Sequence, residues 1–333
     1  MRGEDAGAGS LPWAILHRSG EQLPDVPPPG YQVATGLLTD LLRGVDDADA
    51  FLPTRRHVGV CRLCGQTRRL TFEHIPPAAA DNARRARGTS SWTVATSPRP
   101  LAFPRGDWFP SQRGVGGYVL CGPCNHTIGA KFVPAYAGLA REIGRSVTAH
   151  AERAGHLPGI LDLQLRGWEL GDVARAALVS LLGVAVHGRL LARYPALSKV
   201  VLSGRGGLPG GLRLGLTVVM GARGRLSAPI CRADDGGCAV FAEVALQPFA
   251  WTLGFTDPPL RPLPRTADVS HWLQYAHREQ APDETTAVPV GALAAPLPGD
   301  YRPADEIATD MPDADQPPPP QSSPAEREDP ATD

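Results

Sequence analysis

Apolar residues recur along this 333-residue chain with two different periods, which predict both helices and strands. Helical spacing predicts helices over residues 35–49, 135–152, 171–193 and 269–277, and another helix is expected to begin at Asn125. Short apolar runs predict strands over residues 70–73, 118–120, 161–165, 212–220, 225–231 and 238–246. This mixture predicts an α+β fold, in which the last two strands form a hairpin.

The apolar pattern weakens at both ends and in one internal stretch, which divides the chain into five segments. Residues 1–30 are predicted to form a flexible leader, and residues 31–53 a helical segment. Residues 54–132 form a cysteine-bracketed module with a long loop-like insertion over 76–117. Residues 133–280 are predicted to form a mixed α+β domain of unknown role, and residues 281–333 an acidic, proline-rich, disordered tail.

Charge is distributed unevenly, although the whole chain carries a formal net charge of only −1. Residues 54–131 hold twelve arginines and lysines against three acidic residues, a local balance of +9. Residues 301–333 hold nine acidic residues against two arginines, a balance of −7. A basic segment and an acidic tail on one chain indicate a module that binds a polyanion and a solvated appendage.

The spacing of the cysteines and the short length of the apolar stretches indicate a soluble, cytoplasmic protein. Four of the six cysteines have metal-type spacing, which is typical of a reducing compartment rather than of a disulfide framework. The segment over residues 11–16 lacks the charged start and cleavage site of a secretory signal. The longest apolar stretch, residues 176–186, has 11 residues and is too short to span a bilayer.

Two Cys-x-x-Cys knuckles are the most specific chemical signal in the chain. They comprise Cys61 with Cys64 and Cys121 with Cys124, and 56 residues separate them. Each knuckle offers two thiolates from a tight turn, and four thiolates make a closed tetrahedral zinc site. The sequence therefore predicts one structural zinc ion, with a plain zinc ribbon or two metal-free turns as alternatives.

Residues beside the knuckles offer a second kind of chemistry. The dipeptide Glu73-His74 lies between the knuckles, and Asn125 directly follows the second. Carboxylate and amide oxygens suit Mg²⁺ or Mn²⁺, and an imidazole titrates near neutral pH and can accept a proton from water. Three alternatives stay open: an ordinary carboxylate at Glu73, a helix N-cap at Asn125, and a surface position or zinc ligation for His74.

Taken together, Thr71-x-Glu73-His74-Ile75-Pro76-Pro77 and Cys-x-x-Cys-Asn125 resemble the HNH endonuclease family, also called ββα-metal or treble-clef nucleases. The match is closest to the four-cysteine zinc branch, which includes phage enzymes that resolve branched DNA, and it covers residues 58–132. The resemblance implies hydrolysis of DNA phosphodiester bonds. It assigns structural zinc to the four cysteines, a catalytic divalent cation to Glu73 and Asn125, and the general base to His74.

Two departures from the family pattern bear on these roles. The asparagine that usually precedes the second knuckle is missing from the sequence Gly116-Gly117-Tyr118-Val119-Leu120. The family's further histidine or asparagine, one helical turn later, is also missing, and His126 directly follows Asn125 instead. Whether His126 is a ligand stays open.

Basic residues of the module are expected to contact the phosphate backbone of double-stranded or branched DNA. The candidates are Arg55, Arg56, Arg68, Arg69, Arg84, Arg85, Arg87 and Lys131. A non-catalytic zinc module that binds nucleic acid is the main alternative function, and a protein-interaction scaffold is a third. Membrane partners are not expected, and the sequence does not determine the oligomeric state.

Overall fold

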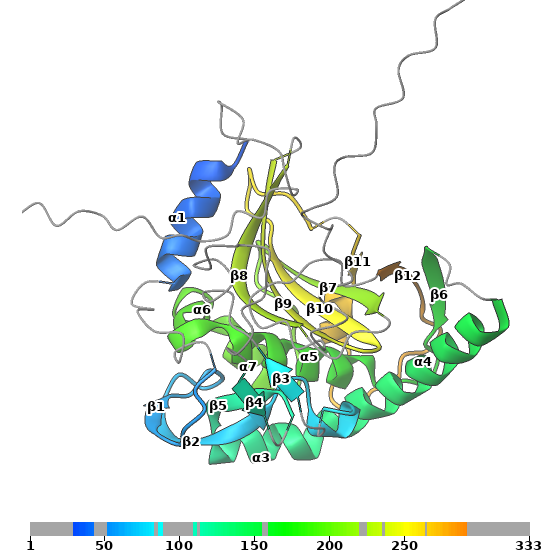
Figure 1. The fold of residues 1–333 in the computed structure, drawn as a ribbon, viewed down its shortest axis with the longest axis horizontal. Coiled ribbons are helices and arrows are strands. Elements are labelled where there is room, and N and C mark those ends of the chain that lie inside the picture. The colour runs from blue at the N-terminus through cyan, green and yellow to red at the C-terminus, as the bar shows by residue number, and fades with distance from the viewer. Residues whose placement is uncertain are drawn as a thin grey trace, which may run out of the picture.

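The computed structural model describes residues 29–42, 52–82, 86–88, 109–111, 114–154, 159–219, 225–234, 237–263 and 265–291. Within these ranges the chain forms a large sheet, a small three-stranded sheet, a two-stranded ribbon and helices packed around them (Figure 1). The mixed α+β class predicted from the sequence is confirmed.

The small sheet has the strand order β1-β2-β5, and all its strands are antiparallel. The strands are β1 (Val58–Val60), β2 (Thr67–His74) and β5 (Gly116–Cys121). Helix α3 (Gly122–Lys131) follows β5 without a loop, and the ribbon of β3 (Ala86–Gly88) and β4 (Phe109–Ser111) belongs to the connection between β2 and β5. Strand, strand and helix therefore adjoin at the edge of the molecule shown at the bottom of Figure 1.

The large sheet has the order β6-β12-β7-β10-β9-β8. The short strand β11 also pairs with β7, at Gly215 and Leu216. All neighbours are antiparallel except β12 and β7. The strands are β6 (Ile160–Gln164), β7 (Leu212–Val219), β8 (Arg225–Asp234), β9 (Gly237–Leu246), β10 (Phe249–Phe255), β11 (Ala267–Asp268) and β12 (Thr285–Gly291).

Helix α5 (Leu170–Val184) connects the two sheets, and each of its residues is buried. It packs against β9 and β10 on one side and against β5 on the other (Figure 1). The long helix α4 (Val133–Ala154) lies beside it, where Trp251 of β10 donates a 3.1 Å hydrogen bond to the Tyr136 hydroxyl. One continuous cluster of buried apolar side chains therefore includes residues of both sheets.

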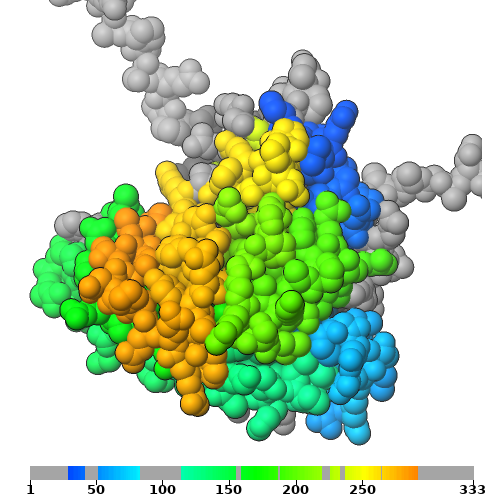
Figure 2. Space-filling view, turned by 180° about the vertical axis from the view of Figure 1, so that it is seen from behind, coloured from blue at the N-terminus to red at the C-terminus, as the bar shows by residue number. Residues whose placement is uncertain are grey.

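Shorter elements complete the described fold. Helix α1 (Tyr31–Leu42) packs on β8 and β9. The others are α6 (Arg189–Arg193), α7 (Ala196–Leu202), and the 3-10 helices η2 (Ala78–Ala80), η3 (Val186–Gly188) and η4 (Ser270–Gln274). Viewed from behind, the C-terminal segment in orange lies directly beside the green middle of the chain (Figure 2).

Three strands of the large sheet, β10, β11 and β12, have no counterpart in the sequence-based prediction. Strand β10 is buried on both faces, so it lacks the alternation that marks a half-exposed strand. The prediction of a disordered tail from residue 281 is wrong for residues 281–291, because β12 pairs with β6 and β7 and buries Val288. The helix predicted over 171–193 is likewise interrupted after Val184.

Several predicted segments fall outside the described residues. These are most of the leader and of the tail, residues 43–51 of the helical segment, and most of the insertion. Among the helices that the structure describes, none combines the length and the apolar character that a membrane crossing requires.

Candidate metal centre

The structure brings the two cysteine knuckles together, as the sequence predicts. The ligand atoms of Cys61, Cys64, Cys121 and Cys124 all lie within 4.8 Å of one another. A tetrahedral ion with zinc–sulfur bonds of ~2.3 Å separates its sulfurs by about 3.8 Å. The Sγ atoms of Cys64 and Cys121 are 3.9 Å apart, so this group can hold a metal ion such as zinc.

Backbone hydrogen bonds shape the first knuckle. The Gly65 N–H donates to the Cys61 carbonyl at 2.9 Å, and the Cys61 N–H donates to the Gln66 carbonyl at 2.9 Å. Gly65 has a φ of +71°, a left-handed conformation that glycine adopts without steric strain. The Arg62 N–H donates to the Val119 carbonyl on β5 at 3.0 Å. This hydrogen bond connects the first knuckle to the strand that precedes the second knuckle.

The second knuckle forms where β5 turns into α3. Cys121 is the N-cap residue of the helix, and Cys124 lies in its first turn. The Cys121 N–H points at the Cys61 sulfur at 3.3 Å. The Cys124 thiol and backbone N–H groups, including that of Cys121, lower the pKa of Cys61 to about 4. A thiolate is the form that binds a metal, so Cys61 is prepared for ligation.

Glu73 lies in β2, directly before His74, and its side chain is almost fully buried. Its relative exposure is 8%, and burial raises the pKa of its carboxyl to about 8. Among the described residues, no hydrogen bond or ion pair to this carboxyl is observed. A buried carboxylate is stable only beside a cation or several hydrogen-bond donors, which makes Glu73 a candidate ligand for a hard cation.

The Glu73 environment predicts a pH-dependent effect of substitution in buffer without Mg²⁺ or Mn²⁺. The carboxyl has a pKa of about 8 in the folded protein and an ordinary value of 4.5 in the unfolded chain. The folded state therefore binds the proton more tightly, and the free energy of unfolding falls as the pH rises from 4.5 to 8. We expect Glu73→Gln to match the wild type near pH 4 and to exceed its unfolding free energy by about 4 kcal/mol above pH 8. Urea unfolding at both pH values measures this difference.

The exposed Glu152 on α4 provides the control, because Glu152→Gln should leave stability unchanged at both pH values. Equal stability of wild type and Glu73→Gln in alkaline buffer would contradict the burial of an unpaired carboxyl.

His74 is the last residue of β2, and its side chain is half-buried. Successive side chains of a strand point to opposite faces, so His74 lies on the face opposite to Glu73. Its ring is 5.1 Å from that of Phe72, which shares this face. Gly116 pairs with His74 on β5, and a Cβ atom there would lie 2.0 Å from the Glu73 carbonyl oxygen. Only glycine permits this close pairing.

Asn125 projects from the first turns of α3 back to β2. Its side-chain amide donates to the Thr71 hydroxyl at 3.1 Å and to the Phe72 carbonyl at 2.9 Å. The two contacts use the N–H groups, so the amide oxygen is the atom left for a cation. Asn125 is not the helix N-cap, since α3 begins at Gly122 and is capped by Cys121. The structure therefore holds Asn125 beside the residues that immediately precede Glu73.

Asn82 is a site residue that the sequence analysis missed. It is 4% exposed, and its amide donates to the carbonyl oxygens of Pro76 and Val115 and accepts the Val115 N–H at 2.7 Å. These bonds fasten the segment after His74 to the start of β5. In the sequence Asn82 is marked only as an amide that follows the apolar run 75–80. Its partner Val115 lies 33 residues later, so no local pattern indicates the contact.

Arg62 is a second missed residue. It belongs to the basic segment of the sequence, but it is 4% exposed and donates to the Gly183 carbonyl near the end of α5. Burial lowers the pKa of its guanidinium to about 9, which leaves it charged at neutral pH. A cation is favourable at a helix C-terminus, so Arg62 couples the first knuckle to the central helix.

We expect Arg62→Met to reduce the unfolding free energy by about 1–3 kcal/mol, since the Gly183 carbonyl loses a charged donor in a buried position. Urea unfolding measures this effect. Arg68→Met, at an exposed position of β2, is the matched control and should change stability by less than about 0.5 kcal/mol. Equal effects of the two substitutions would show that the contact with α5 does not contribute.

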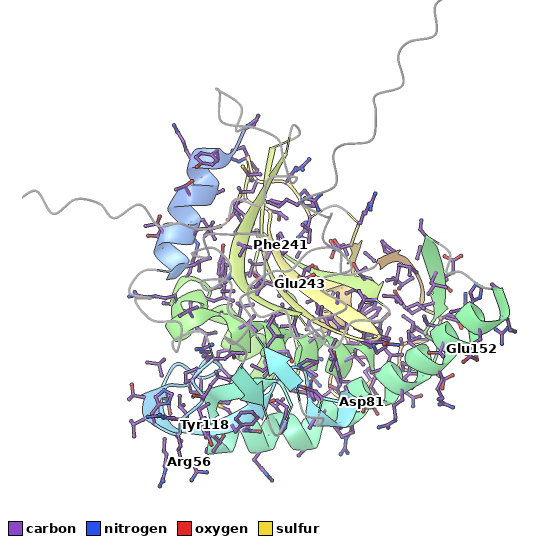
Figure 3. All side chains as sticks on the ribbon, in the orientation of Figure 1. Arg56, Asp81, Tyr118, Glu152, Phe241 and Glu243 are labelled. Carbon is purple, nitrogen blue, oxygen red and sulfur yellow. The ribbon has the colours of Figure 1, made fainter. Side chains whose placement is uncertain are left out.

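The predicted phosphate contacts are distributed over the outside of the module. Arg55, Arg56, Arg68, Arg69 and Lys131 are exposed, and Arg56 projects away from the body of the protein in Figure 3. His126 is exposed on α3. Arg84 and Arg85 lie outside the described residues, as does the side chain of Arg87, whose backbone forms the middle of β3.

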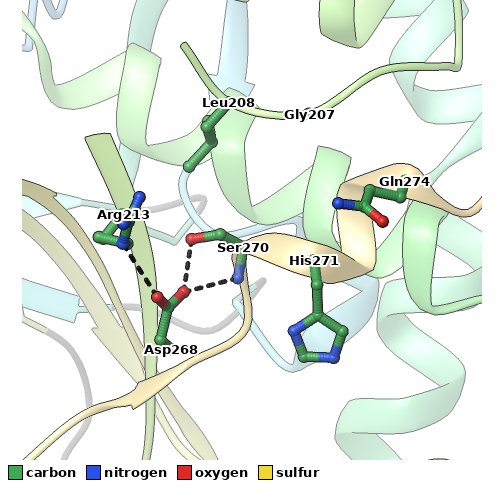
Figure 4. Close-up of a pocket in the computed structure, with 7 residues that line it drawn as sticks. All are labelled: Gly207, Leu208, Arg213, Asp268, Ser270, His271 and Gln274. Carbon is green, nitrogen blue, oxygen red and sulfur yellow. Dashed lines mark hydrogen bonds and ion pairs between the residues drawn. The ribbon is translucent and has the colours of Figure 1, made fainter. Parts of the chain in front are cut away.

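A separate polar depression lies in the C-terminal half of the chain and contains none of the predicted site residues (Figure 4). Asp268 accepts hydrogen bonds from the Ser270 hydroxyl and N–H and pairs with Arg213 at 3.1 Å. His271 at its rim pairs with Glu284. These groups satisfy one another, which is the pattern of a structural network rather than of a ligand site.

Comparison of the chain with models of protein families, with curated proteins and with solved structures found no match. Functional inference therefore depends on the residues and geometry of the site itself.

Proposed function

We propose that this chain is a metal-dependent endonuclease of the HNH type, which hydrolyses DNA phosphodiester bonds. The observation that carries the proposal is the pair of hydrogen bonds from Asn125 to β2, immediately before Glu73 and His74. The order β2, β5, α3 with four cysteines gathered at its turns also agrees with a ββα-metal module. In this proposal zinc on the cysteines is structural, and catalysis uses a different ion.

The donor set fits a hard divalent cation. Glu73 and Asn125 contribute only oxygen atoms, which suit Mg²⁺ or Mn²⁺ better than zinc. The buried Glu73 carboxyl has no other observed partner among the described residues and becomes a ligand once it loses its proton. When bound, such an ion offsets charge on the phosphate oxygens.

His74 supplies the proton-transfer step in the proposed mechanism. Neutral imidazole accepts a proton from water, the resulting hydroxide attacks phosphorus, and the bond from phosphorus to the leaving oxygen breaks. His74 and Glu73 occupy the last two positions of β2 on opposite faces, so in this proposal the phosphate binds at that end of the strand. Asn82 positions the chain that leaves this end.

Exposed arginines supply the affinity for DNA in this proposal. Arg55, Arg56, Arg68 and Arg69 neighbour the candidate centre in the chain, and residues 52–72 include no acidic residue. Such contacts bind phosphates with little dependence on sequence and with strong dependence on salt.

One observation favours a second function, a zinc module that binds nucleic acid without cleaving it. The Glu73 carboxyl is buried and protonated at neutral pH unless a cation occupies its surroundings. Nicking of a supercoiled plasmid in Mg²⁺ or Mn²⁺ distinguishes the two. Cleavage that requires the added ion supports the nuclease, whereas salt-sensitive DNA binding without cleavage supports the binding module.

A further inference from the structure

Two aromatic side chains form one surface with the candidate base, His74. Phe72 and His74 project from β2, and Tyr118 projects from β5, where it pairs directly with Phe72. The Phe72 ring lies 5.1 Å from that of His74 and 5.6 Å from that of Tyr118, with both pairs edge to face. All three side chains are half-buried. We call Phe72, His74 and Tyr118 the aromatic face.

The aromatic face lies on the side of the small sheet opposite to Glu73, and Tyr118 packs in part against the apolar core. Thr71 and Glu73, on the opposite face of β2, are turned towards α3, because Thr71 bonds Asn125. The burial of β5 alternates only over its first four residues, where Gly117 is buried and Tyr118 half-buried. Gly116 pairs with His74 and has no side chain, so β5 places no side chain directly beside His74.

Three exposed arginines belong to the segments that adjoin the aromatic face. Arg68 is an exposed residue of β2, about 20 Å along the strand from His74 at ~3.3 Å per residue. The Tyr118 N–H donates to the Pro53 carbonyl at 2.8 Å, which brings the segment of Arg55 and Arg56 alongside β5. Tyr118 and Arg56 both lie in the lower part of the molecule in Figure 3, where the small sheet is drawn. Aromatic rings together with exposed arginines are typical of surfaces that bind single-stranded nucleic acid.

We infer that the aromatic face stacks against unpaired bases of the substrate, so that the preferred DNA contains a single-stranded segment next to the bond that is cut. Bases in a duplex hide their ring faces in the helical stack, whereas unpaired bases expose them to aromatic side chains. An acidic peptide would use the arginines but not the rings. The inference rests on the proposed nuclease function for the position of the scissile phosphate, but binding can be tested without cleavage.

The test measures binding of a short, fluorescein-labelled DNA single strand, and of the same strand in a duplex, in buffer without Mg²⁺ or Mn²⁺. We expect Phe72→Leu and Tyr118→Leu each to weaken single-strand binding by about 5- to 100-fold, with a much smaller effect on the duplex. Tyr118→Phe keeps the ring and should bind like the wild type. Tyr31→Leu, at a half-buried position on α1, is the matched control.

A strand carrying 2-aminopurine reports stacking directly, because the fluorescence of this base falls when it stacks on an aromatic ring. Quenching that is lost in Tyr118→Leu but kept in Tyr118→Phe supports the inference. Wild-type preference for the duplex, or single-strand affinity unchanged in both leucine variants, overturns it even if the protein cleaves DNA. Stacking without any cleavage in Mg²⁺ or Mn²⁺ instead refutes the nuclease and retains the aromatic face.

Discussion

Replacing His74 by alanine is expected to slow plasmid nicking by about 100- to 10,000-fold in saturating Mg²⁺ or Mn²⁺. The substitution removes the only imidazole at the end of β2, while Glu73 and Asn125 remain to hold the cation. Since the loss concerns proton transfer and not charge neutralisation, duplex DNA should bind with nearly the same affinity. Rates of nicking and fluorescence anisotropy of labelled DNA separate the two effects.

His150→Ala supplies the matched control, because this residue lies on α4 and takes no part in the candidate centre. Its nicking rate should equal that of the wild type. A His74→Ala protein that cleaves at the wild-type rate would remove His74 from the mechanism, and the position of its side chain on the face opposite to Glu73 would then be the reason.

Loss of a metal ion from the four-cysteine group is expected to have the largest effect on stability. Structural zinc contributes about 10–16 kcal/mol to the folding of small zinc domains, whereas whole proteins are stable by only about 5–15 kcal/mol. Cys61, Cys121 and Cys124 are buried and belong to the same apolar core as both sheets. We therefore expect Cys124→Ser to release zinc and to unfold at least the small sheet and α3 at room temperature.

Zinc content after purification and circular dichroism measure the two consequences. Cys238→Ala is the control, since Cys238 is buried in the β8–β9 hairpin and lies outside the four-cysteine group. It should retain the same zinc content as the wild type with a modest loss of stability. Full zinc occupancy in Cys124→Ser would instead indicate that the metal uses other ligands.

Local spacing in the sequence was sufficient for part of the fold. The hairpin strands over 225–231 and 238–246 correspond to β8 and β9, because a polar glycine-rich turn separates two apolar runs. The knuckles were identified in the same way, since Cys-x-x-Cys is a property of neighbouring residues. The sequence also identified the strand–helix junction at Cys121 to Asn125, although the helix begins three residues earlier than predicted.

Other elements depend on contacts between distant residues. Strand β12 contains a proline and follows polar residues, and it becomes a strand because β6 and β7 offer it backbone partners. Strand β10 lacks alternation because both its faces are covered. Neither condition exists in a local window of sequence, so periodicity alone cannot reveal these strands.

The candidate site shows the same division. Residue types and spacing indicate thiolate ligands at four cysteines, oxygen donors at Glu73 and Asn125, and a base at His74, because ligand chemistry belongs to the side chain itself. The burial of a side chain, its hydrogen-bond partners and the direction in which it points depend on the tertiary structure. Tertiary packing alone raises the pKa of the Glu73 carboxyl and buries the Arg62 side chain. It also brings Asn82 within hydrogen-bond distance of Val115, 33 residues later in the chain. The physical reason is that desolvation and hydrogen-bond partners are set by neighbours in space, whereas spacing patterns record only neighbours along the chain.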